Sequence, residues 1–312
     1  MIEIKRYTPD DAEAWNLFVK ESRNGTFLFD RGYMDYHSDR FEDCSLMAYR
    51  GGRMIGIFPA SIDGQTVVSH GGLTYGGLIL SSKALYSDAE DFLRQAAEYY
   101  RSNGANGLIY KKVPYIYNRI PADEDLFALW RMGAGISGRQ ISSTIDLKNP
   151  PKFFNIRKQG IKKASRLGVT VEETTDYEPF WKVLTHNLME RYNRLPVHSH
   201  SEIQLLAGRF PENIRLFTAT KDGRTLAGVV MFVTDRVAHA QYISANQEGK
   251  ASGALDLVFS HLITEIFQDK QFFDFGISTE HGGQYLNESL LYQKEGFGGR
   301  AVMYDVYTLN LR

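Results

Sequence analysis

The sequence contains almost no cysteine: Cys44 is the only one in 312 residues, so the chain cannot form an internal disulfide. Proteins that do without disulfides are typical of reducing compartments, and we expect this one to be cytoplasmic. Long apolar runs are missing as well, because stretches such as 227–233 are far too short to cross a bilayer. The first residues also lack the apolar segment of a signal peptide. These absences predict a protein without a membrane span.

An excess of charge of one sign is absent too. The chain has 36 Lys and Arg residues against 37 Asp and Glu residues, which gives a formal net charge of -1. This balance argues against a nucleic-acid-binding surface over the whole protein, although it permits a local basic patch. With 43% hydrophobic and 23% charged residues, the chain has the composition of a globular protein, and its length suits two domains.

One pattern of expected elements occurs twice along the chain. Residues 45–60 and 215–232 each read as a strand, a glycine turn, an arginine and a strand with an internal glycine. The offset of roughly 170 residues is too long for a solenoid repeat, so it indicates a duplicated domain. The alternative is that any mixed α/β domain shows hairpins followed by a helix. The run Asn149-Pro150-Pro151 interrupts structure between the halves, so we expect domains at 1–147 and 148–312, with a last strand that could pair with either.

Periodicity and turn residues predict the individual elements. Thr8, Pro9 and Asp11 have the pattern of a helix start, and residues 24–41 read as a loop. We expect helices at 86–101, 123–130, 153–167, 177–194, 251–268 and 286–294. We expect strands at 2–7, 45–49, 54–62, 107–112, 140–147, 169–173, 214–221, 225–234, 237–243, 271–275 and 301–309.

Three stretches carry a resemblance to a known family: the basic segment 156–173, the strand pair 216–233, and the segment 272–298, in which an Asp-Phe-Gly strand end leads to Lys-x-x-Phe-Gly. Together with the element order, they resemble the GNAT acyltransferase fold, and the duplicated form resembles its FemAB-type and BioF2-like branch. The resemblance implies an α/β (mixed α+β) protein of two tandem GNAT-like domains, each a mainly antiparallel sheet flanked by helices. It is closer over 150–312 than over the first half.

The resemblance also implies an activity: transfer of an acyl group to an amine. We expect an N-acyltransferase that uses an acyl-CoA such as acetyl-CoA. The expected acceptor is a small molecule, an amino sugar or nucleotide sugar, or another cell-envelope or polysaccharide precursor. No metal is expected. Two alternatives stay open, namely aminoacyl transfer from an aminoacyl-tRNA, as in the FemAB branch, and a binding module that keeps the fold without turnover. The sequence gives no indication of the oligomeric state.

The expected donor site lies where a helix follows the strand 237–243. In the superfamily a CoA pyrophosphate sits on backbone N–H groups at this helix start, in a loop reading Arg/Gln-x-x-Gly-x-Gly/Ala. This chain has only Lys250-x-x-Gly253 there. Small residues still allow the backbone to approach an anion, and the helix end is positive. We therefore expect Lys250, Ser252 and Gly253 to bind the donor, unless the glycines form only a turn.

Acyl transfer to an amine needs a base of near-neutral pKa and a group that protonates the leaving atom, but no covalent nucleophile. Asp274 and Glu280 are the candidate bases, since they follow the strand expected at the cleft. Tyr242 is the candidate proton donor, and His70, in a glycine-rich stretch, is a further acid–base candidate. Each of these residues has an alternative, purely structural role: Asp274 could hold a turn, and the other side chains could only pack against neighbouring residues. Cys44 is expected to be a small buried side chain rather than a nucleophile.

A further set of residues is expected to bind the acceptor: Tyr75, Arg157, Lys158, His198 and Lys294. Arg157 and Lys158 share a basic helix face with Lys162, Lys163 and Arg166, which suits a nucleotide-sugar diphosphate, a tRNA acceptor stem or an anionic glycan. A solvated helix flank explains this face equally well. The histidines around Ser199 do not have the spacing of a metal site, and Ser199 or Ser201 could cap the next helix.

Overall fold

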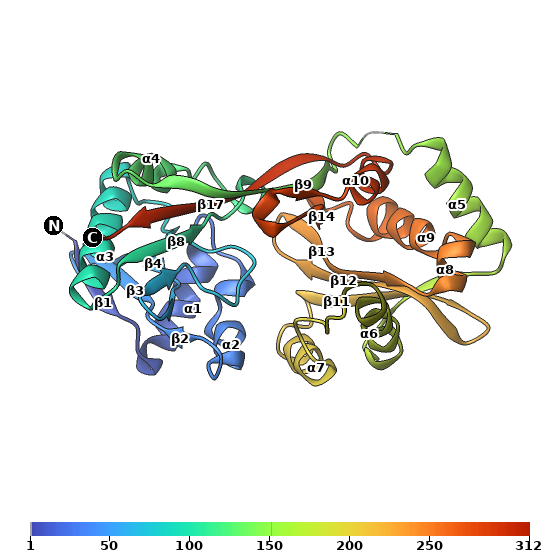
Figure 1. Ribbon diagram of the computed structural model, residues 1–312, viewed down its shortest axis with the longest axis horizontal. Coiled ribbons are helices and arrows are strands. Elements are labelled where there is room, and N and C mark those ends of the chain that lie inside the picture. The colour runs from blue at the N-terminus through green and yellow to red at the C-terminus, as the bar shows by residue number, and fades with distance from the viewer. Residues whose placement is uncertain (1, 151) are drawn as a thin grey trace. The chain divides into compact units, whose positions relative to one another are not determined.

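The structure is a computed structural model that describes residues 2–150 and 152–312, so Pro151, part of the predicted interruption, lies outside the described residues. Its internal contacts divide the chain into two compact units (Figure 1). The first unit contains the chain up to Gln140 together with Thr279–Tyr285 and Met303–Arg312. The second unit contains Ile141–Ser278 and Leu286–Val302.

The chain changes units inside two strands. It leaves the first unit within β9 (Gly135–Asp146) and returns for its last residues within β17 (Arg300–Asn310). The two units therefore interleave in sequence, whereas the repeat predicts a single boundary. The limits 1–147 and 148–312 stay a prediction about which segments fold on their own.

The strands of the first unit are short and mostly antiparallel: β1 (Glu3–Arg6), β2 (Glu42–Asp43), β3 (Leu46–Arg50), β4 (Arg53–Phe58), β5 (Ser61–Asp63), β6 (Thr66–Val68), β7 (Ile79–Leu80), β8 (Gly107–Lys111) and the end of β17. They pair in the orders β1-β3-β4-β7 and β17-β8-β6-β5-β2. Gly51 and Gly52 both have positive φ in the β3–β4 turn, as a tight hairpin requires. The strand expected at 54–62 is wrong in its extent, because the chain leaves β4 at Phe58 and β5 pairs with β2 and β6 instead.

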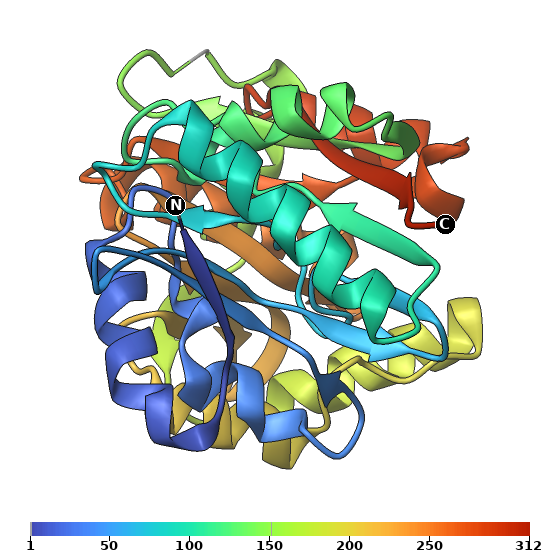
Figure 2. The same ribbon diagram turned by 90° about the vertical axis from the view of Figure 1, so that its left-hand side faces the viewer.

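Helices of the first unit cover its strands: α1 (Ala12–Glu21), α2 (Arg31–Met34), α3 (Tyr86–Ser102) and α4 (Glu124–Arg131). A capping box between Thr8 and Asp11 precedes α1, as predicted. The segment 24–41 is not only a loop, because Asp30 caps α2 by accepting a hydrogen bond from the Gly32 backbone N–H. Figure 2 shows α3 running across the strands. Its Phe92 and Leu93 belong to the hydrophobic core of this unit.

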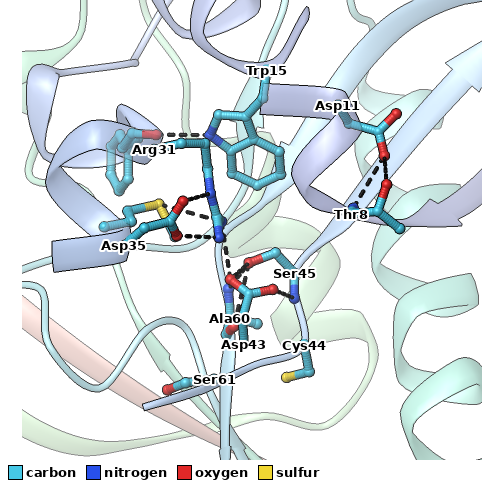
Figure 3. Close-up of polar contacts among 12 residues, drawn as sticks. Thr8, Asp11, Trp15, Arg31, Asp35, Asp43, Cys44, Ser45, Ala60 and Ser61 are labelled. Atoms are coloured by element: carbon cyan, nitrogen blue, oxygen red, sulfur yellow. Dashed lines mark hydrogen bonds and ion pairs between the residues drawn. The ribbon is translucent and has the colours of Figure 1, made fainter. Parts of the chain in front are cut away.

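A buried arginine joins α2 to the strands of the first unit (Figure 3). The Arg31 guanidinium donates to Asp35 at 2.5 Å and to Asp43 at 2.9 Å, and it stands 3.7 Å from the centre of the Tyr7 ring. Asp43 also accepts a hydrogen bond from the Ser45 backbone N–H. Each charge of this cluster is already paired, and removal of one partner would leave an uncompensated buried charge.

The second unit contains one sheet in the order β10-β11-β12-β13-β14-β9. Its strands are β10 (Thr170–Thr174), β11 (Ile214–Lys221), β12 (Arg224–Val233), β13 (Val237–Ala245), β14 (Phe272–Ile277) and the end of β9. Every pairing is antiparallel except β13 with β14, which is parallel. This mainly antiparallel sheet with helices on it confirms the predicted mixed α/β fold class.

Helices lie on both faces of this sheet: α5 (Asn155–Arg166), α6 (Glu178–Tyr192), α7 (His200–Arg209), α8 (Gln247–Ser252), α9 (Ala254–His261) and α10 (Glu288–Glu295). On one face, α9 packs on apolar side chains of β11 to β14, with α5 beside it. On the other face lies α6, whose Phe180 contacts the position of Gly228 in β12. Among the described residues, no helix combines the length and apolar character needed to cross a bilayer.

Two expected elements of the second unit are wrong in their limits. The helix predicted at 251–268 begins earlier, at Gln247, and is interrupted at Gly253, whose φ of 82° is left-handed. After His261 the chain continues as a wider turn over Leu262–Ile266. Periodicity alone does not reveal such breaks, because the apolar face continues across them. The strand predicted at 140–147 begins five positions earlier, at Gly135.

Candidate active site

The strands β13 and β14 separate in the middle of the sheet. Their parallel ladder runs from the pair Val237 and Phe272 to the pair His239 and Asp274. Beyond it, β13 continues beside β12 and β14 continues beside β9, and both of these pairings contain a register shift. The sheet therefore opens directly after His239 and Asp274.

At this opening the Asp274 carboxylate is fully buried and accepts hydrogen bonds from three side chains. Two come from β9, from the Ser142 hydroxyl at 2.5 Å and the Thr144 hydroxyl at 2.8 Å. The third comes from Nδ1 of His239, 2.7 Å from Oδ2. Ser142 and Thr144 lie two residues apart, so they point to the same face of their strand. Asp274 of β14 is thus held by groups from the two neighbouring strands, β9 and β13.

This contact determines which nitrogen of His239 carries the proton. A carboxylate only accepts hydrogen bonds, so Nδ1 must be protonated, and in the neutral ring Nε2 is then a base. The structure records no partner for Nε2 in the described part of the chain, and Nε2 is not among its buried unpaired atoms. The His239 side chain is 11% exposed, so Nε2 is available to a substrate. A base oriented by a carboxylate is the arrangement of many acyl-transfer sites.

Lys294 of α10 lies close to this pair. Its buried ammonium donates to the backbone carbonyl oxygens of Gly276 at 2.8 Å and Ile277 at 2.7 Å. Burial lowers the pKa of Lys294 to about 8, while the charge of Asp274 acts to raise it. The bonded carbonyls lie at the register shift of β14, so Lys294 stabilises the bend by which β14 leaves β13.

Tyr242 lies on the same face of β13 as His239, because a bulge at Gln241 shifts the alternation. Its hydroxyl lies 2.5 Å from Nδ1 of His198, and its ring meets Trp181 of α6 edge to face. Two predicted site residues, Tyr242 and His198, therefore contact each other. The next residue, Ser199, caps α7, as the sequence suggests.

Hydrogen-bond acceptors and carboxylates of the chain itself lie in the segment after β13. At the start of α8, Asn246 accepts a hydrogen bond from the Gly249 backbone N–H, and Glu248 forms an ion pair with Arg224 at 3.0 Å. In the first turn of α9, Asp256 forms an ion pair with Arg157 at 2.7 Å. Each of these helices thus carries an acidic residue in its first turn, where negative charge is favourable.

The predicted donor ligands also have partners within the chain. The buried Ser252 hydroxyl donates to the carbonyl oxygen of Gly249 at 3.2 Å, and the Gly253 N–H bonds to the same carbonyl. Lys250 is exposed, with Nζ 3.5 Å from Oδ1 of Asn187. Lys158 of the basic face is exposed on α5, whereas its neighbour Arg157 is held by Asp256.

The contact between α5 and α9 depends on Gly160. A Cβ at this position would lie 1.8 Å from a carboxylate oxygen of Asp256. Gly160→Ala is therefore expected to lower the free energy of unfolding by about 1–3 kcal/mol, although alanine is the better helix former. Gly208→Ala in α7 is the control, because nothing lies within 4 Å of its Cβ. Urea unfolding of both variants checks this, and equal midpoints would contradict the close packing.

Three predicted site residues belong to the first unit and not to this cluster. His70 is buried and stacks on His37 at 5.6 Å, and burial lowers its pKa to about 3, which makes it a weak base. The buried Tyr75 donates to the Thr26 hydroxyl at 3.2 Å, and Glu280 is exposed. Cys44 is buried as predicted, and burial raises the pKa of its thiol to about 12, so it is not a nucleophile.

The structure thus brings together Asp274, Tyr242, His198 and Lys294 in the second unit and adds residues that the sequence analysis missed. His239 had a signal, since it is a titratable residue within an otherwise apolar part of its strand, beside the strand that ends in Asp-Phe-Gly. Ser142 and Thr144 had none, because only the pairing of β9 with β14 brings them to Asp274. Within the described ranges, no group of three or more His, Cys, Asp or Glu residues could hold a metal ion.

Comparison with known proteins identifies the architecture. A family model described as acetyltransferase (GNAT) domain matches residues 152–285. No curated protein is similar enough in sequence to count as a match. The solved structure of FemX is similar over 99% of this chain and 97% of its own, with 12% identity and a TM-score of 0.70.

Two further solved structures have the same fold. The C-terminal domain of a candidate lysylphosphatidylglycerol synthetase from Agrobacterium fabrum covers 96% of this chain and 92% of its own, with 14% identity and a TM-score of 0.64. A tandem GNAT protein from the clavulanic acid biosynthesis pathway covers 100% and 99%, with 13% identity and a TM-score of 0.54. The expected tandem GNAT architecture is confirmed. Residues 152–285 are therefore a GNAT-type acyltransferase domain, and the chain as a whole has the tandem-domain, FemAB-like fold of these solved structures.

Proposed function

We propose that this chain transfers an aminoacyl group from the ester of an aminoacyl-tRNA to an amine of a cell-envelope precursor, with His239 as the general base. The proposal prefers the aminoacyl ester to the acyl-CoA donor that the sequence favours. The two donors differ at the helix start after β13, because only acyl-CoA would place a pyrophosphate there.

The observation that carries this preference is the pair of carboxylates at that helix start. Glu248 and Asp256 occupy the first turns of α8 and α9, and Asp256 is fixed by Arg157. A pyrophosphate placed there would be close to these carboxylates, and the Gly249 N–H already has Asn246 as its acceptor. An aminoacyl ester carries no pyrophosphate beside its reacting carbonyl. The exposed cations of α5 support the same donor, since Lys158, Lys162 and Lys163 could contact tRNA phosphates.

The fold similarities support the same choice. FemX and the candidate lysylphosphatidylglycerol synthetase have higher TM-scores than the tandem GNAT protein. The name of the second protein describes attachment of a lysyl group to a lipid, which is an aminoacyl transfer. For this chain the same type of chemistry requires a base, a hydrogen-bond donor to the developing oxyanion and an acid that protonates the leaving oxygen.

The side chains of the opening can fill these roles. The acceptor nitrogen attacks the ester carbonyl carbon, and Nε2 of His239 takes the proton that the nitrogen loses as the C–N bond forms. The same proton passes from Nε2 to the ribose oxygen as the C–O bond breaks, which leaves an amide and a tRNA with a free hydroxyl. We assign to the Tyr242 hydroxyl the role of donating a hydrogen bond to the carbonyl oxygen, while it accepts one from Nδ1 of His198. Asp274, the expected base, instead keeps the proton on Nδ1 and stabilises the imidazolium.

A second candidate is the expected transfer of an acetyl group from acetyl-CoA to an amino sugar or polysaccharide precursor. It is supported by the match to an acetyltransferase domain model and by the tandem GNAT protein, whose description names AcCoA. In this case Lys250, Ser252 and Gly253 would have to exchange their present partners for the donor.

A donor assay separates the two candidates. The protein is incubated with tRNA charged with labelled amino acids and with hydroxylamine as a small amine acceptor, and loss of label from tRNA is followed. We expect enzyme-dependent transfer and no change in thermal unfolding with CoA or acetyl-CoA. A bound CoA at a hundredfold excess over its Kd would add about 3 kcal/mol of stability. Stabilisation by CoA together with thiol release from acetyl-CoA would establish the second candidate instead.

A further inference from the structure

The end of α6 and the loop after it expose large apolar side chains to water. Met189 is 43% exposed, Tyr192 is 50%, Leu195 is 69% and Val197 is 76%. Earlier in the same helix the apolar side chains are buried against the sheet, as Phe180 shows. Four exposed apolar side chains within one short segment are unusual for a surface that meets only water.

Two arginines alternate with these apolar side chains. Arg191 and Arg194 are both exposed. The ion pairs on α6 join other residues, Lys182 to Glu178 and His186 to Glu190. No ion pair that the structure records for the described residues involves Arg191 or Arg194. We call the segment 189–197, with its four apolar side chains, its two arginines and Glu190, the α6 rim.

The α6 rim is continuous with the active site. Asn193 ends α6 in the left-handed conformation, with a φ of 49°, and turns the chain away from the helix axis. The residue after the rim, His198, is buried and contacts the Tyr242 hydroxyl. A molecule bound at the rim would therefore lie next to the side chain that we assign to the carbonyl oxygen.

We propose that the α6 rim docks on the surface of a bilayer containing anionic lipids and brings a lipid-borne acceptor to His239. Apolar side chains flanked by arginines suit the boundary between headgroups and acyl chains, where the apolar groups insert and the guanidinium groups bind phosphates. Tyr192 suits the same boundary, because its ring is apolar and its hydroxyl polar. The identity of the acceptor rests on the proposed function, whereas docking itself does not.

Vesicle binding of the full chain tests the docking. The protein is sedimented with vesicles of phosphatidylcholine alone and of phosphatidylcholine mixed with phosphatidylglycerol. We expect binding to the mixed vesicles that weakens with salt, and little binding to the neutral ones. The double variant Leu195→Ser/Val197→Ser should bind the mixed vesicles at least about tenfold more weakly than the unaltered protein. The double variant Arg191→Ala/Arg194→Ala should lose the preference for phosphatidylglycerol.

The matched control is the exposed apolar pair of α4 in the first unit. Phe127 and Trp130 are 52% and 70% exposed and stack on each other, but the neighbouring Arg131 is paired with Glu90. Phe127→Ser/Trp130→Ser should leave vesicle binding unchanged. Circular dichroism and the unfolding midpoint verify that every variant is folded.

Several results would overturn the docking proposal. These are equal binding to both kinds of vesicle, no binding to either, or unchanged binding after Leu195→Ser/Val197→Ser. Loss of charged-tRNA binding in this variant would assign the rim to tRNA, and a dimer that the variant dissociates would assign it to a second copy of the chain. The hydroxylamine assay on the unaltered protein is independent of vesicles. Its failure would remove the proposed function while leaving a positive vesicle result intact.

Discussion

His239→Asn is expected to lower the rate of acyl transfer by about 10²- to 10⁴-fold, the contribution typical of a general base. The asparagine amide can replace Nδ1 as the donor to Asp274, so the buried carboxylate keeps its third hydrogen bond. What disappears is Nε2, the atom that takes the proton from the attacking nitrogen. The free energy of unfolding should therefore change little while turnover falls.

Asp274→Asn tests the pair of His239 and Asp274 by changing the carboxylate instead of the imidazole. An amide can turn its NH₂ group toward His239, which would then keep its proton on Nε2 and no longer act as a base. The Ser142 and Thr144 hydroxyls can reverse their roles and donate or accept as needed. We expect a loss of turnover similar to that of His239→Asn, with a pH–rate profile that lacks the limb of a titrating base.

The measurement is single-turnover loss of label from charged tRNA, together with urea unfolding of each variant. His261→Asn is the control, since this histidine lies on α9, on the opposite face of the sheet, and pairs with Glu265. Transfer at the unaltered rate by His239→Asn would exclude His239 as the base. A fall in activity that follows a fall in stability would indicate that the pair only holds the strands together.

Acidification from pH 7 to pH 5 is expected to lower the free energy of unfolding of the first unit by about 2 kcal/mol through His70 alone. Burial lowers the pKa of His70 to about 3, and nearby His37, Lys111 and Arg31 act in the same direction. An unfolded histidine has a pKa of about 6.5. Between these values the unfolded chain binds the proton and the folded chain does not, so stability falls as the pH falls.

Urea unfolding at pH 7, 6 and 5 measures this slope. In a Trp181→Phe background, fluorescence comes from Trp15 and Trp130, which both belong to the first unit. His70→Asn is the informative variant, because His70 has a φ of 58° and asparagine tolerates this left-handed conformation. It should flatten the pH dependence. An equal slope in both proteins would show that the acid sensitivity arises elsewhere.

The sequence predicted the elements of the second unit along the chain better than the contacts between them. Asp274, Tyr242, His198 and Lys294 were candidates because the sequence places each near an expected strand end, helix end or glycine turn, and these are local patterns. His239 was missed because its role depends on the residue opposite to it. The ladder that pairs it with Asp274 joins strands separated by a helix, and a single sequence does not contain that register.

Glycines explain why the sequence suggested ligand sites around His70 and at Gly253, which the geometry supports least. The stretch around His70 is rich in glycine because side chains pack against it: a Cβ at Gly72 would lie 2.2 Å from Nε2 of His37. At the other site, Gly253 packs against the backbone of Gly160. In both places a small residue permits contact between segments of the chain itself, and composition does not distinguish this from contact with a ligand.

The return of the chain through β17 has a consequence for the order of events during synthesis. Tyr307 and its neighbours pair with β8, so the first unit receives one of its strands from residues that follow the second unit in the sequence. All segments of the second unit, which ends at Val302, are made before that strand. The half of the protein that is translated first is therefore the last to be completed, and an interrupted message yields an N-terminal fragment that cannot close its own sheet.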